Sequence, residues 1–217
     1  MQKIHINAAP SAPRLILCLG AHSDDIEIGC GGAILRLLEE TPEAKVFWVI
    51  LSSNEERAEE ARASADEFLN NAAEKHILIK QFKDGYFPFI GGEIKDFFEE
   101  LKKMVSPEII FTHHRKDRHQ DHQLICELTW NTFRNHLILE YEIPKYEGDL
   151  GAPNLYFELD ERVAKQKITL LMNNFATQRN KPWFTRDVFL SIMRIRGMEV
   201  HARENFAEAF YCEKVVL

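Results

Sequence analysis

The sequence of 217 residues has no long hydrophobic run and few cysteines. No stretch approaches the ~20 consecutive apolar residues of a membrane-spanning helix, so we expect no membrane span. Residues 1–13 have no apolar core of the kind found in secretory signals, and their composition predicts a loose N-terminal arm. The four cysteines form no Cys-x-x-Cys pair. This favours reduced structural thiols and a cytoplasmic location over disulfides or a thiolate metal site.

An excess of positive charge is also lacking. The 34 acidic residues outnumber the 27 basic ones and give a formal net charge of −7. Because binding to a phosphate backbone needs a basic surface, this balance argues against a nucleic-acid partner. It is compatible with a small-molecule substrate that one or two arginines contact. The oligomeric state stays open, a homo-oligomer included.

Two common cofactor and nucleophile signatures are missing as well. The run Gly29-Cys30-Gly31-Gly32 fails the G-x-G-x-x-G spacing, because Ile34 stands where the third glycine belongs. Close packing of a helix on a sheet explains these glycines better than a dinucleotide site. Ser23 lies in no G-x-S-x-G elbow, so neither an organic cofactor nor a serine nucleophile is predicted.

Short apolar runs and amphipathic segments alternate over the first 112 residues. This pattern predicts an α/β fold in which a mostly parallel sheet carries helices on both faces. The predicted strands cover residues 14–19, 45–51, 76–79 and 108–111, and the predicted helices cover 29–38, 55–70, 91–104 and 121–135. Beyond them we expect a long loop at 144–153, helices at 161–175 and 186–195, and a final strand at 209–216, all within one domain of residues 14–217.

A polar cluster, His22-Ser23-Asp24-Asp25, follows the first apolar run directly. Ligands bind at the carboxyl ends of parallel strands, where this cluster should lie. Two adjacent carboxylates repel one another unless a cation or a shared proton offsets their charge. His22 and Asp25 suit a divalent metal, which leaves Asp24 to accept a proton. The alternative is an ordinary surface turn or an aspartate cap on the next helix.

A second polar cluster follows the strand predicted at 108–111, and four of the nine histidines lie between residues 113 and 122. His119 and His122 are three residues apart, so they share one face if a helix begins there. His122 is the better candidate ligand, and Asp121 could orient an imidazole. His113 and His114 are expected either to finish the strand or to contact substrate.

The two clusters together resemble a known family. Residues 21–32, Ala-His-Ser-Asp-Asp-Ile-Glu-Ile-Gly-Cys-Gly-Gly, resemble the [AP]-H-P-D-D-x-E-x-G-C-G-G signature of PIG-L-type (LmbE-like) N-deacetylases. His119-Gln120-Asp121-His122 resembles the family's H-x-D-H motif, and Arg57-x-x-Glu60 a weaker third feature. The resemblance covers about residues 14–135 and implies a Rossmann-like three-layer sandwich, the LmbE-like fold. One departure is Ser23, which replaces the usual proline.

The resemblance also implies roles for individual residues. The metal ligands fall on His22, Asp25 and His122, and the metal is Zn²⁺ or another divalent ion. The general base falls on Asp24. The imidazole that stabilises the oxyanion falls on His119, with Asp121 as its orienting partner, and Arg57 contacts substrate.

We therefore expect a zinc-dependent hydrolase that removes an N-acetyl group from an amino-sugar derivative. One alternative is a metallohydrolase that acts on an ester or a non-sugar amide. The other is a catalytically silent sugar-binding protein with a structural metal. The polar and aromatic segment 140–149 is predicted to line or cover the substrate pocket, with Glu142 and Tyr146 as substrate contacts.

Overall fold

The computed structural model describes residues 14–216, so the predicted N-terminal arm at 1–13 lies outside the described residues. Seven strands form one sheet in the order β3-β2-β1-β4-β5-β7-β6. The strands are β1 (Leu15–Gly20), β2 (Lys45–Ile50), β3 (Glu74–Ile79), β4 (Ile109–His113), β5 (Leu137–Tyr141), β6 (Leu155–Leu159) and β7 (Phe206–Tyr211). The helices are α1 (Asp25–Glu40), α2 (Glu55–Phe68), α3 (Gly91–Met104), α4 (Gln120–Thr132), α5 (Glu161–Asn174) and α6 (Arg186–Glu199), with short 3₁₀ turns η1 (Phe87–Phe89) and η2 (Ala176–Gln178).

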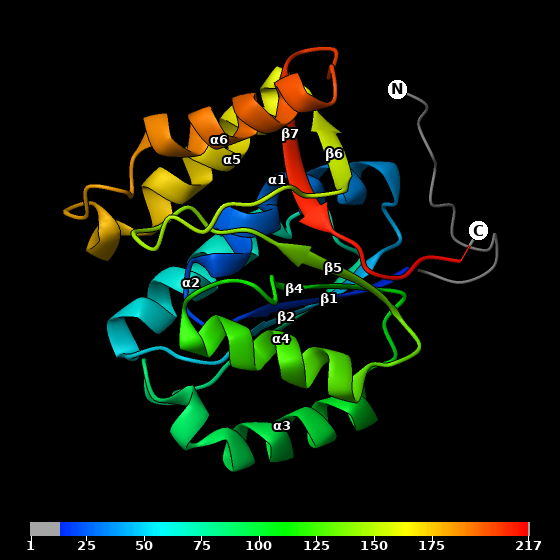
Figure 1. Cartoon of the computed structure of the whole chain (residues 1–217), viewed down its shortest axis with the longest axis vertical. Helices are drawn as coiled ribbons and strands as arrows, with labels where there is room; N and C mark the ends of the chain where they lie inside the picture. The colour runs from blue at the N-terminus through cyan, green and yellow to red at the C-terminus, as the bar shows by residue number, and fades with distance from the viewer. Residues whose placement is uncertain (1–13, 217) are drawn as a thin grey trace.

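Helices cover both faces of the sheet, and the predicted three-layer α/β architecture is confirmed. Figure 1 shows α3 and α4 below the sheet and α1, α2, α5 and α6 above it. The central strands explain this arrangement, because alternate residues point to opposite faces. In β1, Ile16 and Cys18 enter the core under α1 and α2, whereas Leu17 and Leu19 enter the core above α3 and α4. Among residues 14–216, no helix is long and apolar enough to cross a bilayer.

The first five strands run parallel, and β7 runs antiparallel to both β5 and β6. The sequence prediction missed β5 and β6. The helix predicted at 121–135 runs almost to the start of β5, and the last two residues of β5 fall in the segment 140–149 that was predicted to line the pocket. β6 is only partly buried and so lacks a continuous apolar signature. The last strand ends at Tyr211 rather than at residue 216, because the chain beyond it is exposed.

The glycine-rich run lies within α1, where it allows the helix to approach its neighbours closely. A Cβ added at Gly29 would lie 2.2 Å from the Tyr141 ring, and one at Gly32 would lie 2.6 Å from Leu159. Close packing, rather than cofactor binding, therefore accounts for these glycines, as predicted. The contact with Tyr141 matters for the site, since that tyrosine lies beside the histidine that ends β4.

Substitution of Gly29 by Ala should destabilise the protein. Alanine normally favours a helix interior over glycine by roughly 1 kcal/mol. Here the new methyl group meets a buried aromatic ring, and overpacking of this kind costs about 1–3 kcal/mol. Urea unfolding should show a lower midpoint for Gly29→Ala. Gly92→Ala is the control because nothing lies within 4 Å of its added Cβ; equal midpoints for the two variants would contradict the explanation.

Candidate metal centre

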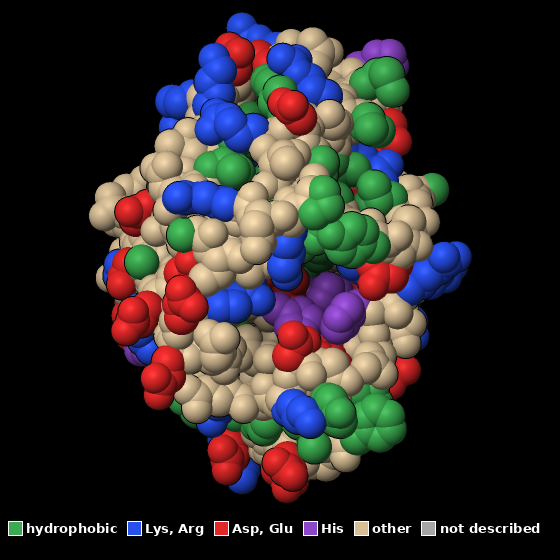
Figure 2. Space-filling view, turned by 90° about the vertical axis from the view of Figure 1, so that its left-hand side faces the viewer, with side chains coloured by type: hydrophobic (Ala, Val, Ile, Leu, Met, Phe, Trp, Pro, Cys, Tyr) green, Lys and Arg blue, Asp and Glu red, His purple; other side chains and the backbone are tan. Residues whose placement is uncertain are grey.

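The two polar clusters meet at the carboxyl ends of β1 and β4, which are adjacent parallel strands. The chain leaves β1 toward α1 on one face of the sheet and leaves β4 toward α4 on the other. This divergence opens a crevice at the edge of the sheet, where open α/β folds bind ligands. Figure 2 shows histidine side chains at the bottom of a hollow on this side, with acidic and basic groups at its rim.

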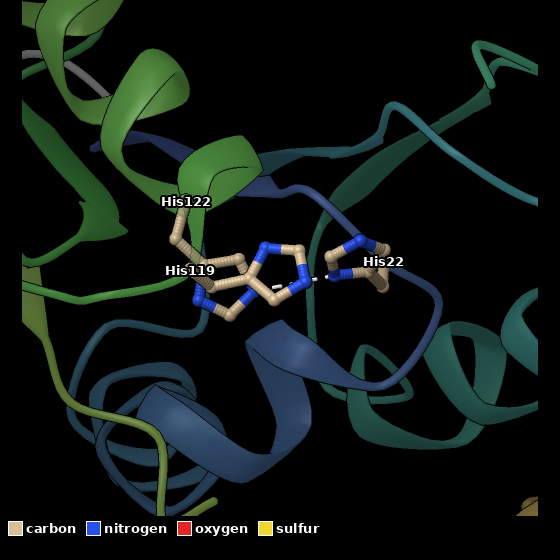
Figure 3. A group of neighbouring side chains, drawn as sticks. All are labelled: His22, His119 and His122. Carbon is tan, nitrogen blue, oxygen red and sulfur yellow. Dashed lines mark hydrogen bonds between the residues drawn. The ribbon is translucent and has the colours of Figure 1, made fainter. Parts of the chain in front are cut away.

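The three residues predicted to bind metal direct one donor atom each toward a common point. His22 Nδ1 lies 3.2 Å from His122 Nε2, and these atoms lie 3.3 and 3.5 Å from Asp25 Oδ2. Donors held about 2.0–2.1 Å from a tetrahedral metal lie about 3.3 Å apart. The separations, together with a mixed imidazole and carboxylate donor set, therefore fit a divalent metal. Figure 3 shows His22 and His122 facing one another, with His119 beside them.

Asp25 is positioned by the turn from β1 into α1. It is the first residue of α1, and its Oδ2 accepts a 2.6 Å hydrogen bond from the backbone N–H of His22. Burial alone would raise the pKa of Asp25, but the imidazoles of His122, His113 and His22 hold this pKa well below its usual range. The carboxyl group therefore stays ionised, as a metal ligand must.

His122 is held from behind by a residue that sequence reasoning missed. Its Nδ1 lies 2.9 Å from Asp117 Oδ2, and Lys145 Nζ donates to the same oxygen at 2.8 Å. Burial and the neighbouring His113 lower the pKa of His122 to about 3, so its ring is neutral and its Nε2 is free to bind a metal. Burial would raise the pKa of Asp117, yet the contact with His122 and the Lys145 charge hold it well below its usual range.

His22 also has carboxylates behind it. Its Nε2 lies 3.0 Å from Asp84 Oδ1 and 3.4 Å from Asp121 Oδ2. Burial tends to lower the pKa of His22, but the charge of Asp25 and the contacts with Asp121 and Asp84 raise it well above its usual value. A metal-binding histidine commonly has such a carboxylate behind its second nitrogen.

Asp121 differs from its predicted role. Its carboxylate accepts hydrogen bonds from the backbone N–H groups of Gly85 (2.7 Å) and Phe87 (3.1 Å), besides lying near His22. The Asp121 carboxylate therefore holds the loop after β3 and lies next to His22. It does not orient His119, contrary to the prediction. His119 Nδ1 accepts from the Asp121 backbone N–H at 3.3 Å, at the N-terminus of α4. The other nitrogen of His119 is thus left to carry a proton.

Asp24 stands apart from the three proposed ligands. Its Oδ1 accepts a 2.7 Å hydrogen bond from Arg57, which lies in the first turn of α2. Its Oδ2 is buried and has no hydrogen-bond partner among residues 14–216. Asp24 occupies the N-cap position of α1 but forms no side-chain cap, so the cap alternative fails. Burial raises the pKa of Asp24, and the Arg57 charge offsets part of that effect.

The segment predicted to line the pocket is only partly near the centre. Glu142 is buried and both of its oxygens bind Arg196 of α6, at 2.6 and 2.7 Å. This ion pair does not fit its prediction as a direct substrate contact. Tyr146 is 72% exposed, which leaves its ring accessible. The link from this segment to the centre is Lys145, through Asp117.

The sequence held weak signals for the missed residues. Asp117 lies five positions before His122, within the histidine-rich segment. Asp84 lies in a Lys-Asp-Gly-Tyr turn after β3, where Gly85 adopts a φ of +74°. Only the fold brings either residue to the centre. Ser23, in the position of the family's proline, bonds Ser53 through its hydroxyl at 3.2 Å and leaves the proposed ligands undisturbed.

A comparison with known families now bears on these residues. The model of the GlcNAc-PI de-N-acetylase family, PIG-L, matches residues 17–133, which include both clusters. This chain belongs to the PIG-L family. That assignment places it among deacetylases. Among the described residues, the groups spaced to hold a metal ion include His22 with His119 and His122, and Asp25 with His113 and His122.

Individual proteins resemble this chain in sequence or in fold. An uncharacterized deacetylase, YaiS of Escherichia coli (strain K12), is 28% identical over 145 residues, which cover 59% of this chain and 74% of the relative. The N,N'-diacetylchitobiose deacetylase of Pyrococcus horikoshii has a similar structure, with a TM-score of 0.65, 18% identity and coverage of 92% of this chain and 83% of that one. The 4-carboxy-2-hydroxymuconate hydratase GalB of Pseudomonas putida KT2440 has a TM-score of 0.66, 17% identity and coverage of 94% and 98%. These structural likenesses show the shared fold.

Metal binding should release about one proton per chain at neutral pH. His22 has a pKa well above its usual value, so it is protonated before metal binds, whereas His122 is already neutral. A metal displaces the His22 proton, so its affinity should fall about tenfold per pH unit below the pKa of His22. Calorimetric titration in two buffers of different ionisation enthalpy counts the protons.

The matched control for this proton count is His76→Gln. His76 is a partly exposed histidine on β3 and is not one of the proposed ligands. The variant should release the same number of protons as the unmodified protein. An affinity independent of pH between about pH 5.5 and 7.5 would contradict the assignment of His22 as a protonated ligand.

Proposed function

We propose that this protein is a zinc-dependent N-deacetylase that removes the acetyl group from an amino-sugar derivative. The observation that carries the proposal is the different surroundings of two adjacent carboxylates in the turn from β1 into α1. Asp25 directs an oxygen toward two imidazole nitrogens, while Asp24 keeps one buried oxygen free. A purely structural metal site needs no spare carboxylate, so this arrangement supports an enzyme over a silent sugar-binding protein.

Zinc held by His22, Asp25 and His122 would supply Lewis acidity that polarises the acetamide carbonyl and acidifies a water molecule. The remaining chemistry belongs to the chain. Asp24 accepts the proton of the attacking water and later delivers it to the departing amine. His119 donates from the nitrogen opposite its backbone contact and stabilises the negative charge that develops on the carbonyl oxygen.

Two residues are proposed to contact substrate. Arg57 offsets part of the rise in the pKa of Asp24 that burial causes. Its Nε is buried and has no hydrogen-bond partner within residues 14–216, so we propose that it also donates to substrate. The exposed ring of Tyr146 can stack on a sugar. The sugar assignment is supported by the family and by a structural neighbour that acts on N,N'-diacetylchitobiose.

A substrate panel tests the reaction class. The purified protein, with and without chelator, is offered N-acetyl sugars, N-acetylated amino acids and simple acetate esters, and acetate release is measured. Chelator-sensitive release from the sugars alone supports the proposal. Release from esters or non-sugar amides alone would replace the sugar assignment. GalB, a hydratase, has a similar fold, which means that the fold alone does not imply deacetylation. If no member of the panel releases acetate, the deacetylase proposal is refuted.

Asp24→Asn and Asp25→Asn should fail in different ways. Without its base, Asp24→Asn should lose on the order of 10²-fold or more in kcat and keep its metal. Asp25→Asn weakens a ligand, so its metal content after dialysis should fall. Elemental analysis and acetate-release kinetics on both variants separate the roles, and each variant serves as the control for the other. Metal loss confined to Asp24→Asn would reverse the assignment.

Arg57→Gln should move the acidic limb of the kcat/KM profile to higher pH. Burial already raises the pKa of Asp24, and the Arg57 charge counteracts this. Without that charge the pKa rises further, so the base stays protonated, and inactive, up to a higher pH. Arg62→Gln, an exposed position on the same helix, should leave the limb in place. A limb that stays fixed or moves to lower pH in Arg57→Gln would rule out Asp24 as the titrating base.

A further inference from the structure

His113, the last residue of β4, has no role in the reaction as proposed, yet it is fully buried at the centre of the site. A buried imidazole needs partners, because an unpaired polar group away from water is costly. Among residues 14–216, His113 Nδ1 has no hydrogen-bond partner, so the contacts of the imidazole are made through Nε2 and the face of the ring. Two of these contacts act on proposed metal ligands.

The first contact fixes the chain next to His22. The backbone N–H of Ala21 donates to His113 Nε2 at 2.9 Å, across 92 residues of sequence. This bond anchors the β1–α1 turn just before His22. It also determines the tautomer, because a nitrogen that accepts this N–H carries no proton itself. The lone pair of His113 Nε2 is thus engaged by the backbone and is not available to a metal.

The second contact restrains His122. The rings of His113 and His122 stack with centroids 3.8 Å apart and planes inclined by 20°. On its other edge, His122 is held by Asp117. The stacked ring of His113 and the carboxylate of Asp117 therefore restrain both the rotation and the displacement of the His122 ring.

His113 also lies next to Asp25, but it forms no hydrogen bond with it. His113 Nε2 is 3.3 Å from Asp25 Oδ2, and a nitrogen that carries no proton cannot donate to a carboxylate. Behind His113, the Tyr141 hydroxyl lies 3.2 Å from the same nitrogen and donates to the Leu19 carbonyl at 2.6 Å. Tyr141 is the ring that packs against Gly29, so the position of His113 is tied to the core.

We propose that His113 is a positioning residue that holds two of the metal ligands, His22 and His122, in their binding geometry without binding the metal. The inference rests on the metal site of the proposed function, but it concerns the supports of the ligands and not the reaction. One side chain joins the β1–α1 turn to the ligand on α4. Its loss should therefore loosen the site as a whole.

Metal binding, rather than catalysis, tests this role. Zn²⁺ affinity is measured by competition with a chromophoric chelator, and the visible spectrum of the Co²⁺-loaded protein reports ligand geometry. His113→Ala removes both the acceptor and the ring, and should lower Zn²⁺ affinity by about 10–100-fold and alter the Co²⁺ bands. His113→Gln restores an acceptor for Ala21 and His113→Phe restores the stacked ring, so each should recover part of the affinity.

Thr112→Val is the matched control, because Thr112 precedes His113 on β4, is equally buried and bonds Thr129 at 3.0 Å. It should lose some stability but keep the Zn²⁺ affinity and the Co²⁺ spectrum. Unfolding by urea identifies any variant that fails to fold, and the Gln and Phe variants then carry the test. Unchanged affinity and spectrum in folded His113 variants would overturn the proposal, as would an equal loss in Thr112→Val. A protein that binds metal as expected but releases no acetate would refute the proposed function and leave this inference standing.

Discussion

The structure depends on one buried carboxylate oxygen. Asp25 Oδ2 accepts the backbone N–H of His22 and lies within 3.5 Å of nitrogen atoms from three imidazoles. A buried, ionised carboxylate is costly unless charge and hydrogen bonds compensate it. In the metal-free protein, protonated His22 supplies part of that charge, and a divalent cation would supply more. The fold therefore maintains a site whose own electrostatics favour a cation.

The adjacent carboxylate shows how strongly environment decides chemistry. Asp24 and Asp25 are neighbours in sequence and both are buried, but their pKa values move in opposite directions. Asp25 faces imidazoles, whereas Asp24 Oδ1 pairs with the guanidinium of Arg57 and Asp24 Oδ2 has no hydrogen-bond partner within residues 14–216. When the surroundings shift the pKa values of two neighbouring acidic groups in opposite directions, the two groups commonly have different chemical roles. Here the difference supports the proposed roles of Asp25 as a metal ligand and Asp24 as the base.

The central part of this arrangement could be predicted from sequence because its signals are local. Strands β1, β2 and β4 are buried on both faces and so appear as continuous apolar runs. The clusters after β1 and β4 then fall at the same edge of the sheet. The prediction failed for β5 and β6, since a short strand next to a helix and a half-exposed strand have no comparable pattern.

The roles that depend on distant partners could not be predicted in the same way. The sequence around Glu142 is the same whether its carboxylate contacts a substrate or an arginine. Its partner, Arg196, lies 54 residues later in the chain. Asp121 was placed next to His119 by its motif, yet its carboxylate is taken up by the loop after β3. Such assignments need the geometry of the folded chain, because nothing nearby in the sequence distinguishes the alternatives.

The residues around the ligands show what the fold adds to the motifs. The donors come from two short motifs, but their supports come from β4, from the loop after β3 and from the segment after β5, through His113, Asp84 and Lys145. Such supports fix the tautomer and orientation of metal-binding histidines and commonly change metal affinity by about 10–100-fold. Asp84 and Lys145 lie in loop segments that follow β3 and β5, outside the two motifs. A change in either segment should therefore alter how firmly the proposed ligands are held even where both motifs are intact.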